Sequence, residues 1–212
     1  MTDLNHDLTI AEQVQVMLQS TPDRLEFGWA ELGAAALVEL ALLGRIGSPG
    51  ESTPASAADT LVTIGEGRTG NRVLDAALDV LESKSSPWPS LHAVIDVGRR
   101  VSPVVQERLS ERGIARIHGR FPSREGYLEI LDDEWFQLES TRLMLARANP
   151  HAVKDSSTGG AVDVFRNGSE RFTDDATRRD PIAYADYPED TVDTIAVILA
   201  GEIAAFPPDT DG

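Results

Sequence analysis

Residues 32–43 read LGAAALVELALL and form the stretch that decides the fold of this chain. Glu39 is the one charged residue in this run, so the pattern predicts a helix that is packed around most of its circumference. Gly44 follows directly and suits the left-handed position beyond a helix end, because glycine has no Cβ to clash there. We therefore expect the other elements to be arranged around this central helix.

Local signals on both sides of the central helix predict further elements. Residues 9–12 read Thr-Ile-Ala-Glu, the spacing of a capping box, and predict the start of a helix that ends near residue 21. Downstream, residues 61–64 have the composition of a short strand, and residues 72–82 repeat apolar side chains at helical spacing. A glycine-rich turn joins these last two elements.

The middle of the chain predicts two short helices and a hairpin. Ser90 is positioned to cap a helix that runs to Gly98, and Ser102 before Pro103 has the form of a second helix start. Short β-type runs follow around residues 114–131, and they predict a β-hairpin. A helical pattern then returns over residues 135–148.

The last third of the chain has a weaker pattern. We expect a small hairpin of residues 161–165 and 170–173, and a final helix over residues 189–206 that closes the core. The whole chain, residues 1–212, is predicted to form a single mainly α domain, a compact helical bundle surrounded by amphipathic helices with a protruding hairpin. Flexible segments are expected at residues 1–8, 47–59, 151–186 and 207–212.

Composition and charge limit the classes of function. The chain has no cysteine, which excludes disulfides and cysteine-based zinc sites. Its formal net charge of −16 opposes generic attraction to nucleic acid or to anionic lipid. The start of the chain lacks a secretion signal, and no apolar run approaches the roughly 20 residues of a membrane span. We therefore expect a cytoplasmic protein that can associate with membranes.

No catalytic motif stands out. Residues 65–70 match G-x-G-x-x-G, but the second strand and acidic residue of a dinucleotide site are replaced by Ser-Pro-Trp-Pro at 86–89, so we interpret the match as a plain loop. The four histidines are scattered, and no G-x-S-x-G motif is present. The sequence therefore predicts a protein that is not an enzyme and that has no catalytic residues, no metal site and no cofactor.

A cluster of arginines is the most informative polar feature. Residues 99–124 contain seven arginines and two glutamates, whereas both flanking regions are acidic. Arg99 and Arg100 directly precede the helix start predicted at Ser102, so their guanidinium groups and free backbone N–H groups could converge on an anion such as phosphate. The alternative is that these arginines neutralise acidic residues within the folded protein.

Several segments in order carry a resemblance to a known family. They are ELALLGRI at residues 39–46, TGNRVLDAAL at 69–78, QERLSERGI at 106–114 and the hairpin that follows. With the helix at Thr9 ahead of them, they resemble the Golgi phosphoprotein family, which also has bacterial members, and this chain is interpreted as one of those. The similarity extends to about Leu131.

The resemblance implies a non-enzymatic adaptor that acts at membrane surfaces. In eukaryotic relatives, one tryptophan and several arginines bind phosphatidylinositol 4-phosphate, and the protein links this lipid to basic protein tails. The resemblance assigns headgroup binding to Trp29, Arg99 and Arg100, while Gly33 and Ser102 stand at two further positions of that pocket. It also implies self-association through the hairpin.

A second class of function shares the predicted order of elements. Two helices followed by a hairpin are also the order of a winged-helix DNA-binding module, in which residues 102–112 would form the recognition helix and residues 116–124 the wing. Such a transcription regulator is the alternative to the lipid-binding adaptor. The overall acidity of the chain argues against it.

Overall fold

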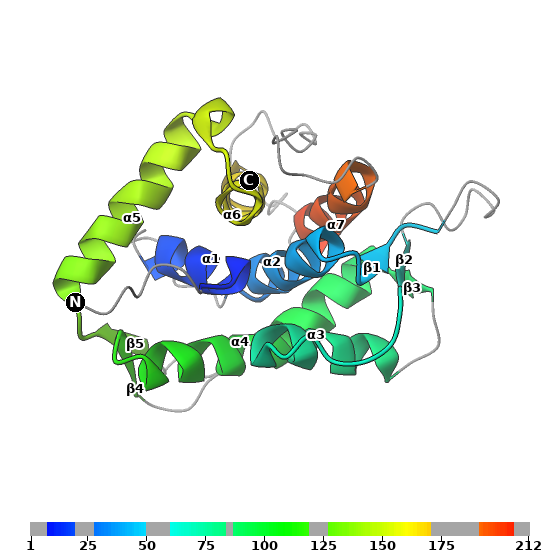
Figure 1. Ribbon diagram of the computed structural model, residues 1–212, viewed down its shortest axis with the longest axis horizontal. Helices are drawn as coiled ribbons and strands as arrows, with labels where there is room; N and C mark the ends of the chain where they lie inside the picture. The colour runs from blue at the N-terminus through cyan, green and yellow to red at the C-terminus, as the bar shows by residue number, and fades with distance from the viewer. Residues whose placement is uncertain are drawn as a thin grey trace, which may run out of the picture.

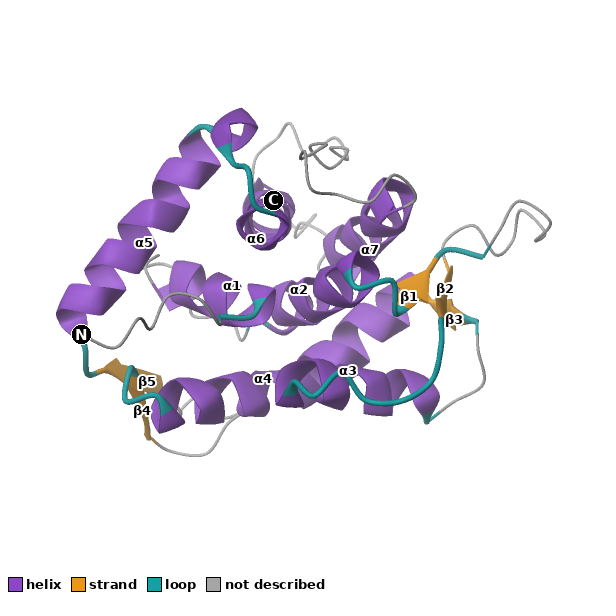
Figure 2. Cartoon of the chain, in the orientation of Figure 1, coloured by secondary structure: helices purple, strands orange, loops and turns teal. Residues whose placement is uncertain are grey.

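The central helix lies where the sequence places it. A computed structural model of the chain describes residues 8–19, 28–49, 60–83, 87–118, 127–170 and 191–205. Helix α2 (Trp29–Leu42) runs through the middle of these residues and is buried along most of its length. Figure 1 shows α6 and α7 on one side of α2, and α3 and α4 on the other. The predicted mainly α class is confirmed, and Figure 2 shows how little of the described chain is strand.

Helix α2 ends at the predicted glycine. Gly44 has a φ of 65°, its N–H donates to the carbonyl of Ala41 at 2.9 Å, and the N–H of Arg45 donates to the carbonyl of Leu40 at 2.8 Å. These are the two hydrogen bonds of a Schellman motif, which satisfies carbonyl groups at the end of a helix. The predicted stop is therefore confirmed at atomic detail.

The predicted capping box starts helix α1 (Ile10–Gln19). The N–H of Thr9 donates to the Glu12 carboxylate at 2.8 Å, and the N–H of Glu12 donates to the Thr9 hydroxyl oxygen at 3.1 Å. Two backbone donors that have no partner in the helix are thus satisfied by side chains. Helix α7 (Thr191–Ala205) packs on α2 as the predicted closing helix.

Helix α3 (Arg72–Glu82) has the bounds that the sequence predicts, but helix α4 (Ser90–Glu111) does not. We predicted two helices that meet near Ser102, whereas α4 is one continuous helix with Pro103 inside it. Ser102 is 3% exposed, and its hydroxyl accepts a hydrogen bond from the Gln106 side chain at 3.2 Å. It does not cap a helix.

The continuity of α4 has a physical cause in its apolar face. Val97, Val101 and Val105 recur at helical spacing on both sides of the proline, and each is fully buried. Pro103 itself lies on the exposed face of the helix, where the carbonyl that loses its N–H partner can contact water. Burying three valines, at roughly 1.5 to 3 kcal/mol each, outweighs the cost of a proline inside a helix, which is roughly 3 kcal/mol.

Two small antiparallel sheets complete the first two thirds. Strands β1 (Ile46–Gly47), β2 (Thr60–Thr63) and β3 (Trp88–Pro89) pair in that order. Strands β4 (Ala115–His118) and β5 (Tyr127–Ile130) form the predicted hairpin, with Ala115 opposite Ile130. The hairpin is confirmed, while its connecting residues 119–126 lie outside the described residues.

The last third contains the largest departure from prediction. Helix α5 (Asp133–Ala148) is confirmed, and a short 3-10 helix η3 (Pro150–Ala152) follows it. Residues 161–165, predicted as a strand, belong instead to helix α6 (Ser156–Glu170). The turn residues Asn167 and Gly168 suggested a hairpin, but Ala161, Val162, Val164 and Phe165 are all buried, which the packing of α6 on α1 and α2 explains.

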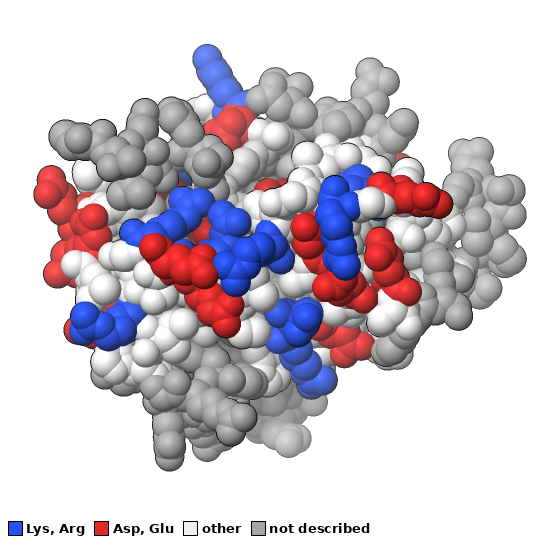
Figure 3. All heavy atoms as spheres, turned by 60° about the horizontal axis from the view of Figure 1, so that its bottom comes forward, with Lys and Arg blue, Asp and Glu red and all other residues white. Residues whose placement is uncertain are grey.

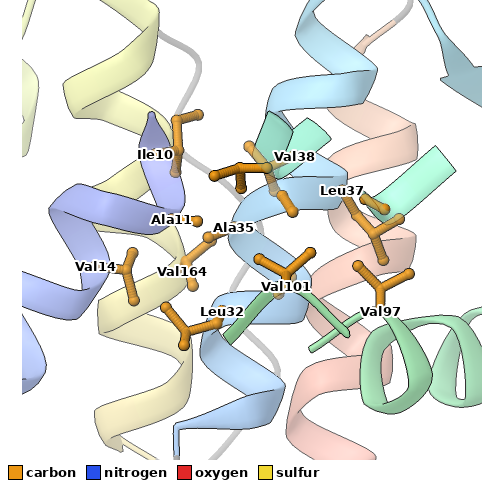
Figure 4. Packing of buried hydrophobic residues seen from close by; sticks show 14 of the residues in the cluster. Ile10, Ala11, Val14, Leu32, Ala35, Leu37, Val38, Val97, Val101 and Val164 are labelled. Carbon is orange, nitrogen blue, oxygen red and sulfur yellow. The ribbon is translucent and has the colours of Figure 1, made fainter. Parts of the chain in front are cut away.

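The core joins these helices around α2. In Figure 4, Ile10 and Val14 of α1, Val164 of α6 and Val101 of α4 approach the α2 side chains from different directions. Of the segments predicted to be flexible, residues 1–7, 50–59, 171–186 and 207–212 lie outside the described residues. None of the helices in the described ranges is both long enough and apolar enough to cross a membrane.

Candidate functional site

Two glycines set the geometry of the site. A Cβ added to Gly33 of α2 would lie 2.0 Å from the carbonyl oxygen of Val94, and one added to Gly98 of α4 would lie 1.8 Å from the carbonyl oxygen of Trp29. The two helix backbones therefore touch where they cross. The resemblance places an arginine of the family's pocket at position 33, and no side chain fits there. This close crossing brings the first turn of α2 beside Arg99.

Trp29 and Arg99 are in direct contact. The guanidinium carbon of Arg99 lies 5.3 Å from the centre of the Trp29 ring, within the range of a cation–π interaction. The two residues are 70 positions apart in the chain, and the close crossing of α2 and α4 brings them together. The structure thus joins two of the three residues predicted to bind a headgroup.

Arg99 and Arg100 line a shallow hollow between α3 and α4. Its volume is about 570 Å³, and α3 contributes Asp79 and Val80, with Ser83 at its end, while α4 contributes Asp96 and the two arginines. Trp29 is not part of this lining and instead contacts Arg99. The hollow is open to solvent, and both arginine side chains are exposed.

The two arginines at the hollow differ from the others in the cluster. Within the described part of the chain, neither Arg99 nor Arg100 forms an ion pair with a carboxylate. Arg108 lies 3.0 Å and Arg112 lies 3.8 Å from the buried carboxylate of Glu12. The interpretation that the arginines neutralise acidic groups therefore holds for Arg108 and Arg112, and not for the pair at the hollow.

Arg116 is also paired, because it contacts Glu129 across the hairpin at 3.1 Å. Arg120 and Arg124 lie outside the described residues. Figure 3 presents the face below α3 and α4, and basic and acidic side chains are intermixed over it. The arginine cluster seen in the sequence is therefore not a continuous basic surface on this face.

The predicted contribution of a helix start to anion binding is wrong. Because α4 continues through Ser102, the backbone N–H groups near this residue lie inside the helix and have carbonyl partners there. What remains of the predicted anion site is the pair of guanidinium groups, which offer only donors and match phosphate geometry.

The winged-helix alternative loses its recognition helix for the same reason. Residues 102–112 are the C-terminal half of α4 and its cap. Two of their arginines, Arg108 and Arg112, pair with the buried Glu12. A DNA-binding helix needs basic side chains that are available to phosphate groups and base edges. The structure does not support this alternative.

The glycine-rich loop is closed by its own hydrogen bonds. The N–H and hydroxyl of Thr69 both donate to the Asp75 carboxylate, at 2.7 and 2.8 Å, and Arg45 donates to the carbonyl of Gly67 at 2.7 Å. The Asn71 side chain accepts from Val73 and caps α3. The Thr69 donors, which a nucleotide phosphate would need, are thus already bound to a carboxylate. This agrees with the interpretation of the motif as a plain loop.

A second hollow, of about 460 Å³, lies between α5 and the start of α6, and no pattern in the sequence pointed to it. Its lining includes Arg142 and Lys154 beside apolar side chains such as Leu145 and Val153. Arg142 donates to both carboxylate oxygens of Glu139 and to the Thr158 hydroxyl. Because these bonds already occupy the Arg142 guanidinium, the hollow beside Arg99 is the better candidate for an anion.

Two acidic residues connect the helices that carry the site. Glu12 is fully buried and contacts Arg108, while the Glu39 carboxylate accepts a hydrogen bond from the N–H of Ile10 at 2.7 Å. The pKa of Glu39 is raised to about 7, chiefly by burial and also by the nearby Glu12 carboxylate, against the Ile10 N–H and Arg108, which lower it. The sequence predicted only a helix cap for Glu12 and no role for Glu39.

Comparison with known proteins gives a family assignment. The family model described as Golgi phosphoprotein 3 (GPP34) matches residues 13–125, which is more than half of the chain. The matched region includes α2, α3, α4 and the first strand of the hairpin, and with them Trp29, Arg99 and Arg100. The comparison with curated proteins found no match.

Among the described residues, no group of three His, Asp or Glu side chains is placed to hold a metal ion.

Proposed function

This chain belongs to the Golgi phosphoprotein 3 (GPP34) family, and from that premise we propose that it is a non-enzymatic peripheral membrane or adaptor protein. Its ligand is an anionic, phosphoinositide-like phospholipid headgroup, and Arg99, Arg100 and Trp29 bind it. One observation supports this proposal above all others. The two arginines line a hollow without a carboxylate ion pair to any described residue, while Arg108, Arg112 and Arg116 are paired.

The chemistry of the hollow suits a phosphate group. A guanidinium group offers several N–H donors in a planar fork, and two such groups side by side can contact more than one phosphate oxygen. The Trp29 ring holds the Arg99 guanidinium in place. Less side-chain entropy is then lost when the ligand binds.

The net charge of the protein shapes how it would meet a membrane. At −16, the whole molecule is repelled at long range by a strongly anionic surface. Binding through two arginines therefore depends on short-range contacts with individual headgroups in a largely neutral membrane. The same acidity suits basic protein tails, which would be the second ligand of an adaptor.

The test is a vesicle sedimentation series. Vesicles of phosphatidylcholine are compared with the same vesicles that contain a small fraction of phosphatidylinositol 4-phosphate. We expect the full chain to bind only the second kind, and Arg99→Ala with Arg100→Ala to weaken this binding at least about tenfold, since charged hydrogen bonds contribute roughly 1.5 to 3 kcal/mol each. Trp29→Ala should weaken it less, and Trp29→Phe least, because phenylalanine keeps an aromatic face.

A matched control removes the same charge elsewhere. Arg72 and Arg116 are exposed arginines that contact glutamates away from the hollow, so Arg72→Ala with Arg116→Ala lowers the net charge equally. Binding that this control weakens as much as the Arg99 and Arg100 pair would point to non-specific attraction. Absence of binding to any phosphate-bearing vesicle would contradict the proposed function.

A further inference from the structure

We propose that the outward face of α5 is an interface between two copies of this chain, which pair their α5 helices antiparallel through a line of leucines. The inference goes beyond the proposed function and does not depend on it. The surface is also separate from the hairpin, through which the family resemblance implies self-association. The hollow between α5 and the start of α6 lies at one end of this interface.

A leucine strip lies exposed along one side of α5. Leu138 and Leu145 are 67% and 65% exposed, and Leu131, just before the helix, is 45% exposed. The three stand seven residues apart, which is the repeat of one position in a helix-pairing seam. Helix α5 packs on α1 and α6 through its other side, where Phe136 and Leu143 are buried, and it forms one edge of the molecule (Figure 1). Single exposed leucines are ordinary, whereas a line of three favours a partner helix.

The same face carries the side chains that a second α5 can pack against. Glu134, Thr141 and Ala148 are exposed and also stand seven residues apart. In an antiparallel pair, each leucine of one copy lies opposite one of these residues in the other. Leu138 then meets Thr141 of the second copy, and Leu145 meets Glu134. Such a pair uses one surface twice, as two-fold dimers do.

The charges at the two ends of α5 favour a second copy as the occupant. Asp133 and Glu134 open the helix. Arg142 and Lys154 line the hollow at its other end, together with Leu145. Because Leu145 lies opposite Glu134 of the second copy, this carboxylate comes to the rim of the hollow beside the exposed Lys154. A parallel pair would bring the two acidic ends together, and an apolar membrane interior would have to desolvate them.

The size of this surface predicts a weak dimer. Helix α5 has 16 residues and is therefore about 24 Å long. One face of a single helix of this length is smaller than the roughly 800 Å² per partner of a stable interface. The net charge of −16 on each copy adds repulsion, which salt at about 0.15 M reduces. We therefore expect a dissociation constant on the order of 10 to 100 μM.

Sedimentation equilibrium of the full chain at about 0.15 M salt tests the interface. The wild type should pass from monomer to dimer as its concentration rises through the expected range. Leu138→Ala with Leu145→Ala should weaken dimerisation at least about tenfold, because most of the buried apolar area is lost, while alanine preserves the helix. Leu43→Ala with Ile64→Ala is the control, since these side chains are 55% and 48% exposed away from α5, and it should dimerise like the wild type.

Charge reversals test the antiparallel direction. Glu134→Lys and Lys154→Glu should each weaken dimerisation, because each places like charges together at both symmetric contacts. Net charge alone predicts opposite effects, since the first variant lowers the negative charge of the chain and the second raises it. An equal mixture of the two variants should form a heterodimer about as tightly as the wild type, because every lysine at the contacts again meets a glutamate.

Three results would overturn the inference. They are a wild type that stays monomeric up to millimolar concentration, a dimer that the α5 variants leave intact, and a mixture that associates no more tightly than either charge variant alone. If the wild type is monomeric and the two leucines are instead needed for binding to phosphatidylcholine vesicles, the leucine strip faces a membrane. Dimerisation should survive Arg99→Ala with Arg100→Ala, so failure of the proposed function would leave this inference standing.

Discussion

The hydrogen atom that Gly98 carries in place of a side chain decides how closely α2 and α4 approach each other. A methyl group there would lie 1.8 Å from the carbonyl oxygen of Trp29, and at Gly33 it would lie 2.0 Å from that of Val94. Both neighbours are backbone atoms, which cannot move without shifting a whole helix. The contact of Trp29 with Arg99 depends on this spacing, so packing and site geometry share one cause.

We therefore predict that Gly98→Ala destabilises the protein by about 3 kcal/mol, the upper end of the range for overpacked cores. Gly33→Ala should cost a similar amount. Gly201→Ala, whose nearest contact is the Ser90 carbonyl carbon at 2.9 Å, should cost less, about 1 kcal/mol. Urea unfolding of the three variants measures the order of their losses in stability. Helix propensity alone favours alanine in all three, so any gain in stability at Gly98 would contradict the close crossing.

Residue identity alone could not distinguish the arginines of the site. Arg99 and Arg108 are the same residue type in the same cluster. Of the two, Arg108 has a structural role because it pairs with Glu12, which lies nearly 100 residues earlier in the chain. The link of Trp29 with Arg99 and Arg100 came from family resemblance, since no local pattern connects residues 70 positions apart. Both contacts, Arg108 with Glu12 and Trp29 with Arg99, arise where helices that are distant in the chain pack together. No short stretch of sequence predicts this packing.

Elements were predicted well where the deciding bonds are local. The capping box at Thr9 and the glycine stop at Gly44 each involve atoms within five residues, so the sequence contains all the information needed. Helices α4 and α6 were mispredicted because burial against distant elements decided them. The local sequence favoured a helix start at Ser102 and a strand at residues 161–165. In both places the packing of a continuous apolar face had the larger effect.

Helix α4 provides a test of that balance. Pro103 removes one backbone hydrogen bond from the interior of α4, so Pro103→Ala should stabilise the protein. The gain should be about 2 kcal/mol, because the roughly 3 kcal/mol of helix propensity is partly offset, by at most about 1 kcal/mol, by the greater freedom of the unfolded chain without proline.

Thermal and urea unfolding of Pro103→Ala measure this gain. Pro89→Ala is the matched control, because Pro89 stands at the N-cap of the same helix with a φ of −59°, where proline costs no helical hydrogen bond. It should leave stability unchanged or slightly lower. A loss of stability in Pro103→Ala would mean that the proline-containing geometry of α4 is itself required by the packing.

At the scale of the whole molecule, α1, α2 and α4 are connected by acidic groups as well as by apolar contacts. Glu12 of α1 reaches Arg108 of α4, and Glu39 of α2 holds the N–H of Ile10 at the start of α1. Such groups fix the relative register of the three helices, but an ionised carboxylate that is not paired by a cation is costly to bury. Glu39 bears this cost, and its pKa is raised to about 7.

The stability of the fold should therefore depend on the protonation of Glu39. Its pKa rises from 4.5 in the unfolded chain to about 7 in the folded protein, so the folded state binds the proton more tightly, and stability is lost as pH increases between these values. Glu39→Gln removes this dependence, because the amide oxygen can still accept from Ile10 without a charge. Relative to wild type, the variant should gain about 2 to 3 kcal/mol between pH 5 and pH 8.

Urea unfolding of both proteins at the two pH values gives the difference directly, and other titrating groups cancel in the comparison. Glu107→Gln, which removes an exposed carboxylate paired with Arg72, is the control and should change by less than about 1 kcal/mol over the same range. If the Glu39→Gln difference is the same at both pH values, Glu39 does not titrate in the folded protein. The start of α1 would then be held to α2 by a carboxylate that stays ionised throughout.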